Sequence, residues 1–252
     1  MSRVAPCRPP RGSASRAPLR PRPVAGALVV AALAIASVQG RPAAAQVPPA
    51  PSEASAYGGL HAAAHRGDVA AIDRLGTSKT ALEARDSHGR TPLHVAAFAR
   101  QRAAIRALAR AGADLSALEN DRYNAVTIAA VADDEETLRV LLQLGASARL
   151  VTSRYDGTAL IAAAHLGHDG VVRQLIAAGA PLDHVNNLHW TALIEVIVLG
   201  DGGLRHQKSL QALLDAGAST SLADRAGVSP LQLARSRGHA EMVRMLERAG
   251  AR

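Results

Sequence analysis

Residues Thr91 to Tyr123, TPLHVAAFARQRAAIRALARAGADLSALENDRY, decide the fold, because their opening and closing phrases recur along the chain at a nearly constant interval. Thr91-Pro92 is typical of a helix start, where a hydroxyl can cap free N–H groups and proline fits the first turn. A second run, with apolar residues three and four apart, predicts a longer amphipathic helix that ends at Gly112. The polar residues that follow predict an exposed hairpin. One unit is therefore a short helix, a longer helix and a hairpin.

The recurrence has a measurable period. The openings at Thr91, Asn124, Thr158 and Thr191 are 33, 34 and 33 positions apart, and Ser229 follows after 38. The phrase T-P-L-H-x-A-A, then a helix and G-A-D, resembles the ankyrin repeat. The resemblance implies an all-α ankyrin-repeat solenoid of about six helix-turn-helix units joined by hairpin loops. We expect it to cover residues 57–252, with units starting near 58, 91, 124, 158, 191 and 229.

The first 45 residues have the pattern of a secretory signal. An arginine- and proline-rich start precedes an apolar run at 24–38, and Ala43-Ala44-Ala45 has the small residues of a cleavage site. We therefore expect cleavage near Ala45 and a periplasmic or secreted protein that meets a membrane only through this export signal. An uncleaved anchor is the alternative, although the apolar run is short for spanning a bilayer. The proline-rich segment 46–56 is expected to be a flexible linker.

Composition limits the partners. Seven arginines and no acidic residue fall in residues 1–45, which leaves 22 basic and 21 acidic residues for the rest. A nearly neutral body gives no reason to expect nucleic-acid binding. The single cysteine, Cys7, lies in the leader, so no disulfide or cysteine-ligated metal site is expected in the processed chain.

Aromatic residues are few and unevenly placed. Each tyrosine and the tryptophan fall where a hairpin is expected, and Arg90 occupies the same position in the second unit. The resemblance implies that hairpin tips and short helices form a concave binding face. Because tyrosine, tryptophan and arginine dominate interface hot spots, we predict a protein-binding stripe there. Its candidate residues are Tyr57, Arg90, Phe98, Tyr123, Tyr155, His165 and Trp190. The alternative is that the rings pack against neighbouring hairpins and stiffen them.

Histidines offer a second hypothesis. His184, His189 and His206 surround the fifth unit, but their spacing fits no compact metal motif, so we expect neither a metal nor another cofactor. The resemblance implies that His61 and His94 hydrogen-bond between units. Glu195 replaces an apolar residue, and we expect a neighbouring amide or His206 to satisfy its carboxylate.

The fifth unit also carries an insertion. Residues 200–209, GDGGLRHQKS, are expected to form a loop, a place where repeat arrays often bind. No enzyme motif is present, so we expect a monomeric, non-enzymatic binding or scaffold module of the cell envelope whose partner is another protein. A secreted effector that binds a host protein is one alternative, and metal-dependent activity around the fifth repeat is the other.

Overall fold

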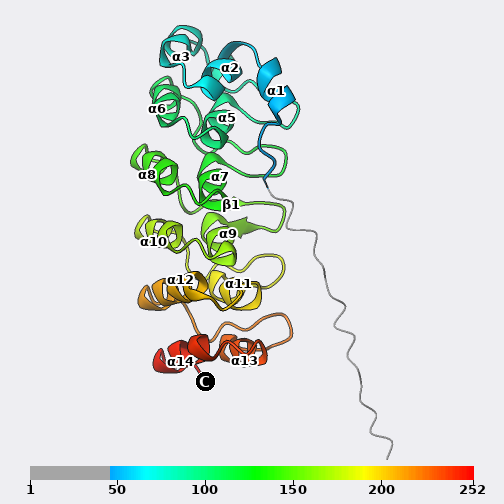
Figure 1. Ribbon diagram of the computed structural model, residues 1–252, viewed down its shortest axis with the longest axis vertical. Coiled ribbons are helices and arrows are strands. Elements are labelled where there is room, and N and C mark those ends of the chain that lie inside the picture. The colour runs from blue at the N-terminus through cyan, green and yellow to red at the C-terminus, as the bar shows by residue number, and fades with distance from the viewer. Residues whose placement is uncertain (1–45) are drawn as a thin grey trace, which may run out of the picture. The chain divides into compact units, whose positions relative to one another are not determined.

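The computed structural model describes residues 46–252, so the expected signal segment, residues 1–45, lies outside the described residues. Helices of the described chain stack in two columns, with the hairpins extending to one side (Figure 1). The short helices form the column beside the hairpins: α2 (Gly59–Arg66), α5 (Pro92–Phe98), α7 (Ala125–Val131), α9 (Ala159–Leu166), α11 (Ala192–Val198) and α13 (Pro230–Ser236). The outer column holds α3 (Val69–Leu75), α6 (Arg102–Arg110), α8 (Glu135–Gln143), α10 (Asp169–Ala177), α12 (Leu204–Asp215) and α14 (Ala240–Arg248). The expected all-α solenoid of helix pairs is confirmed.

The short helices begin at the residues that open each unit. Thr158 and Thr191 cap α9 and α11 by accepting hydrogen bonds from the backbone N–H groups of Ile161 and Ile194. Small side chains then let neighbouring units approach closely, so that Ala63, Ala96, Ala130 and their counterparts are fully buried. A row of leucine, isoleucine and valine from both columns completes one continuous core along the array.

The outer helices end as the sequence predicts. After α6 the chain turns at Gly112, whose φ of 95° is costly for any residue with a Cβ. Ala113 N–H then donates to the Leu108 carbonyl at 3.0 Å, which satisfies an acceptor that the helix end would otherwise leave free.

The remaining elements are small. Helix α4 (Lys79–Leu82) follows α3, and strands β1 (Val151–Thr152) and β2 (Gly157–Thr158) pair antiparallel in the hairpin before the fourth full unit. No helix in residues 46–252 is long and apolar enough to cross a membrane.

Two sequence-based expectations need correction. The supposed flexible linker 46–56 contains helix α1 (Pro51–Ala56), and the Val47 carbonyl and the Glu53 carboxylate both bind the guanidinium of Arg90. The supposed loop 200–209 is helical from Leu204, because the insertion lengthens α12 to 12 residues where α6, α8, α10 and α14 have 9. Composition suggested a flexible linker and a loop, but both segments contain a helix that is held by contacts to the array.

Candidate protein-binding surface

One acceptor side chain shapes each hairpin. Asp86 accepts hydrogen bonds from the backbone N–H groups of His88 and Arg90, both at 2.9 Å. The equivalent acceptor, always five residues before the next unit opens, is Glu119, Ser153, Asn186 and Asp224 in the later hairpins. Sequence reasoning missed this series, although the recurrence of an acceptor residue at a fixed offset was visible.

Backbone hydrogen bonds join consecutive hairpins. Asn120 N–H donates to the His88 carbonyl at 3.1 Å, and Asn187 N–H donates to the Tyr155 carbonyl at 3.0 Å. Exposed ion pairs reinforce the centre of the array, where Arg122 meets Asp156 at 2.9 Å. The hairpins therefore present one connected surface to solvent.

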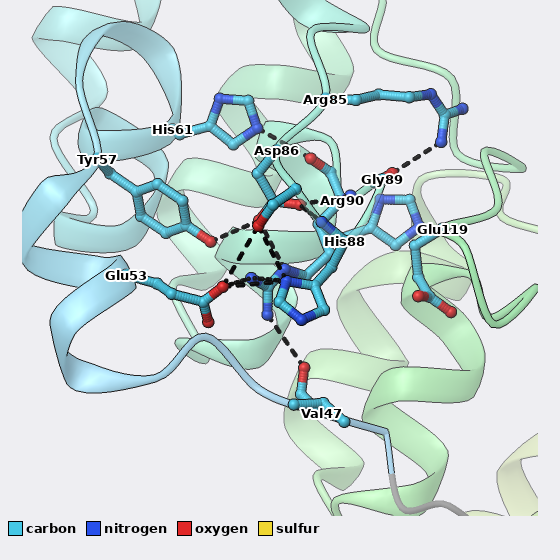
Figure 2. A network of polar contacts seen from close by, with 12 residues as sticks. Val47, Glu53, Tyr57, His61, Arg85, Asp86, His88, Gly89, Arg90 and Glu119 are labelled. Atoms are coloured by element: carbon cyan, nitrogen blue, oxygen red, sulfur yellow. Dashed lines mark hydrogen bonds and ion pairs between the residues drawn. The ribbon is translucent and has the colours of Figure 1, made fainter.

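Arg90 does not contribute its side chain to that surface. The guanidinium lies in a network of polar contacts beneath the first hairpin, and only 1 % of the side chain is exposed (Figure 2). Its Nε donates to Asp86 at 2.6 Å, Nη1 to the Val47 carbonyl at 3.1 Å and Nη2 to Glu53 at 3.2 Å. The prediction that Arg90 belongs to an exposed stripe is wrong, because burial and three acceptors hold it inside.

Tyr57 closes the same network from the first unit. Its hydroxyl donates to Asp86 at 2.7 Å, and its ring lies 5.5 Å from that of His61 (Figure 2). Burial alone raises the pKa of Asp86, but hydrogen bonds from Tyr57, Arg90 and His88 outweigh it and lower that pKa to about 2. Burial, followed by the bond to Asp86, raises the pKa of Tyr57. Tyr57 is thus half-buried, with its polar end turned inward.

Tyr123 and Phe98 pack mainly within the array. Tyr123 is only 8 % exposed and belongs to the hydrophobic core, and burial raises the pKa of its hydroxyl. Phe98 is partly buried against the same core. Tyr123 therefore follows the packing alternative rather than the stripe.

The other three candidates, Tyr155, His165 and Trp190, are half-buried and keep part of their surface in solvent. Tyr155 and Trp190 share their two hairpins with exposed apolar side chains. We call the set Val151, Tyr155, Val185, Leu188 and Trp190 the hairpin patch. Leu166 and Leu199, at the ends of the neighbouring short helices α9 and α11, are exposed as well. Apolar exposure is therefore concentrated around the two hairpins that precede α9 and α11.

His165 is held by a buried carboxylate. Glu195 is only 4 % exposed, and its two oxygens meet Asn186 Nδ2 at 3.0 Å and His165 Nδ1 at 3.2 Å. The expected amide partner is confirmed, but the histidine partner is His165 instead of His206. His206 bonds to Asp201 and to the His165 carbonyl. An ionised Glu195 favours the tautomer with the proton on Nδ1, which leaves Nε2 as an acceptor.

Three further histidines, His61, His94 and His184, bind backbone carbonyls. His61 Nε2 meets the Arg90 carbonyl at 2.9 Å and His94 Nε2 meets the Tyr123 carbonyl at 3.1 Å, which confirms their expected bridging role. His184 Nε2 lies 2.6 Å from the Asp156 carbonyl. Residues 46–252 contain no group of three histidine, cysteine, aspartate or glutamate side chains placed to hold a metal ion. The sequence cluster around the fifth unit is therefore not a spatial one.

Comparisons with known proteins agree with this architecture. The family model for ankyrin repeats matches residues 60–152 and 126–224. A putative ankyrin repeat protein of Escherichia coli K12, YahD, is 42 % identical over 100 residues, a match that covers 39 % of this chain and half of that protein's length.

Solved structures extend the likeness. An ankyrin repeat domain of Acinetobacter baumannii is 44 % identical, covers 77 % of this chain and 98 % of that domain, and superposes with a TM-score of 0.71. The ankyrin repeat domain of Bcl-3, described as a member of the IkappaB family, is 29 % identical over 78 % of this chain and 88 % of that domain, with a TM-score of 0.69. Ankyrin repeats generally mediate contacts between proteins. The chain described here belongs to the ankyrin repeat family.

Proposed function

We propose that this chain is a non-enzymatic, monomeric protein-binding module whose contact site is the hairpin patch. The observation that carries the proposal is the distribution of exposed apolar residues. Of eight large hydrophobic side chains exposed in residues 46–252, three lie on the two hairpins, Val151, Val185 and Leu188, and two more, Leu166 and Leu199, lie at the C-terminal ends of the short helices that follow them. Clustered apolar exposure of this kind marks interaction sites on proteins that are otherwise polar outside.

His165 supplies a polar contact beside the apolar ones. Its side chain is 34 % exposed, and the contact with the buried carboxylate of Glu195 holds the ring in place. Within residues 46–252 its Nε2 has no hydrogen-bond partner, so it is available to an N–H or O–H group of a bound protein. Trp190 and Tyr155 add the aromatic area that anchors interfaces.

We also propose that binding takes place outside the cytoplasm, in the cell envelope. The arginine-rich start, apolar run and alanine triplet in residues 1–45 support export. Sequencing the N-terminus of the protein recovered from an envelope fraction tests this proposal. A chain that begins at Gln46 would agree with it, and recovery of the whole chain from the cytoplasm alone would rule it out.

Crosslinking and affinity capture from living cells tests the binding site. The full chain is compared with a patch variant, Leu188→Ser with Trp190→Ala, and with a control variant, Leu75→Ser with Leu204→Ser. The control residues are exposed leucines outside the patch. We expect a protein that the wild type and the control capture and the patch variant loses, with helical content unchanged in all three. Capture of the same protein by the patch variant would place binding elsewhere.

A further inference from the structure

Helix α6 carries a row of arginines, of which Arg106 and Arg110 are exposed and Arg102 is half-buried. Arg102, Arg106 and Arg110 are spaced by four residues, so they share one face of the helix, and Arg110 is 61 % exposed. The opposite face is buried through Ala104, Ile105, Ala107 and Leu108. We call the three arginines the arginine stripe. Helix α6 belongs to the outer column of helices (Figure 1), and the arginine stripe lies on its face opposite the buried residues.

The arginine stripe is nearly without partners in the described part of the chain. Arg102 and Arg106 make no side-chain hydrogen bond or ion pair within residues 46–252, and Arg110 only approaches Asp73, at 3.8 Å. Three other outer helices, α8, α10 and α14, neutralise an arginine of their own instead. Arg139 pairs with Glu136, Arg173 with Asp169, and Arg244 with Glu241. Of the six outer helices, α6 is the one whose sequence holds no acidic residue.

This arrangement is unfavourable for the helix itself. Helices α8, α10 and α14 carry an acidic residue in the first turn, where the helix dipole favours negative charge. Helix α6 begins with Arg102, a positive charge at the positive end. Arginines four residues apart also repel each other. Helix α6 therefore breaks a local rule twice, and the described part of the chain offers only the distant contact of Arg110 with Asp73 in return, which points to a further compensating contact outside the array.

From this surface we infer a second binding site, distinct from the hairpin patch, for an acidic helix of another protein. Four residues advance a helix by about 6 Å, so a partner helix with a carboxylate at every fourth position would match the stripe residue for residue. Exposed Ala103 and half-buried Ala109 flank the arginine stripe on its two sides and are small enough to let the backbone of a partner approach. Paired guanidinium and carboxylate groups can then form forked hydrogen bonds.

The surroundings favour a narrow partner over a broad anionic surface. Helix α6 packs between α3 and α8, and α8 presents Glu135 and Glu136 to solvent. A nucleic acid or an anionic membrane would extend over these carboxylates and be repelled by them. In a single helix aligned with α6, the carboxylates of the facing side would lie over the arginines rather than over α8. Charge complementarity is therefore confined to the length of one helix.

An NMR titration of the full chain at low ionic strength tests the inference. The probe is an alanine-based helical peptide with glutamate at every fourth position, and the control peptide has the same composition with the glutamates spread around the helix. We expect the first peptide to shift amide signals of α6 and to bind about tenfold more tightly than the second, since three exposed ion pairs are gained together. Raising the salt concentration should abolish the difference.

Matched variants locate the site. The stripe variant replaces Arg102, Arg106 and Arg110 with glutamine, and the control variant replaces Arg139, Arg173 and Arg244, one self-paired arginine on each of three other outer helices. The stripe variant should lose the tighter binding and keep or raise its melting temperature. The control should bind as the wild type does. If the stripe variant fails to fold, Arg106→Glu alone replaces it.

Three outcomes would overturn the inference. They are equal binding of both peptides, equal binding by wild type and stripe variant, and tighter binding of a short DNA duplex or of phosphatidylglycerol vesicles than of the acidic peptide.

Discussion

The first hairpin and the hairpin before α11 have the same backbone arrangement but side chains of different character. Those of the first are polar and turned inward, and those of the later one are apolar and partly exposed. In the first, the residue that precedes the unit is Arg90, and it turns inward to Asp86, Glu53 and the Val47 carbonyl. In the later hairpin the equivalent residue is Trp190, which stays half-exposed, and the tip carries Leu188, 41 % exposed. The scaffold is constant, so the side chains alone decide whether a hairpin is closed by polar contacts or left open with apolar ones.

The contrast extends to the short helices behind the hairpins. One turn into each helix, the first two units carry His61 and His94, which bind the carbonyl of the next unit, and α7 carries Thr127, which meets Thr152 at 2.9 Å. The same position in α9 and α11 is Ile161 and Ile194. At this helix position, therefore, the N-terminal units are joined by hydrogen bonds and the later ones by apolar packing. Among these units, a titratable histidine therefore occupies this helix position only in the first two.

The largest effect is expected from Arg90→Ala. Removing the guanidinium leaves Asp86, whose side chain is 9 % exposed, without its cation, and breaking a buried ion pair in this way costs about 3–5 kcal/mol. The free energy of unfolding from urea denaturation measures it. The control is Arg122→Ala, which removes an exposed pair with Asp156 and should cost less than about 1 kcal/mol. Equal losses for the two variants would show that the buried Arg90 network stabilises the protein no more than an exposed ion pair does.

The second effect is a pH dependence carried by His94. Burial lowers the pKa of His94 to about 4 in the folded chain, below its ordinary value of 6.5. The unfolded chain therefore binds more protons between these values, so stability is complete above pH 6.5 and declines as the pH falls toward 4. A shift of this size corresponds to a loss of about 3 kcal/mol across the window.

Urea denaturation at several pH values measures the slope. His94→Gln removes the titrating group, so its stability should depend less on pH in that window than that of the wild type. A slope unchanged by the substitution would show that other groups titrate instead.

The architecture could be predicted from the sequence because it repeats. The same helix start recurs at Thr91, Thr158 and Thr191, so a helix boundary that is unclear in one unit can be assigned from the others. The two segments outside the repeat, 46–56 and 200–209, were wrongly predicted as linker and loop. Their helices depend on contacts that no periodic pattern reveals, such as Glu53 with Arg90 and Arg205 with Asp133, the latter 72 residues apart.

The candidate site could be predicted only in part. Arg90, Tyr123 and Trp190 were all predicted to bind a partner because of their position in a hairpin. That position does not determine whether a side chain turns toward the core or toward solvent. Arg90 turns inward because Asp86, Glu53 and a carbonyl converge on it, and Glu53 comes from outside the repeat. Glu195 was recognised from its departure from an apolar pattern, and its link to His165 needed the packing of adjacent units. A residue's direction depends on its neighbours in space, which the repeat period does not specify.

A third and smaller effect is expected from His189→Gly. His189 has a φ of 63°, at the position where the first hairpin has Gly89 with a φ of 73°. A left-handed backbone costs a non-glycine residue about 1–2 kcal/mol, offset by the greater freedom of glycine in the unfolded chain. We therefore expect the variant to be about 0.5–1 kcal/mol more stable in urea denaturation. Destabilisation would mean that the imidazole makes a contact that outweighs the strain.

The smallest effect on stability should come from Leu188→Ser. This side chain is 41 % exposed at a hairpin tip, and substitutions at such positions usually change the free energy of unfolding by no more than about 0.5 kcal/mol. Leu193→Ser, in the buried part of the next helix, is the matched control and should cost several times more, because that leucine is 1 % exposed. Parallel urea titrations of both variants measure the contrast. If Leu188→Ser is as damaging as Leu193→Ser, the leucine is a packing residue and the open, apolar hairpin is not a free surface. If it is neutral, packing does not require a leucine at this position, which agrees with an open hairpin whose apolar side chains are free to contact a partner.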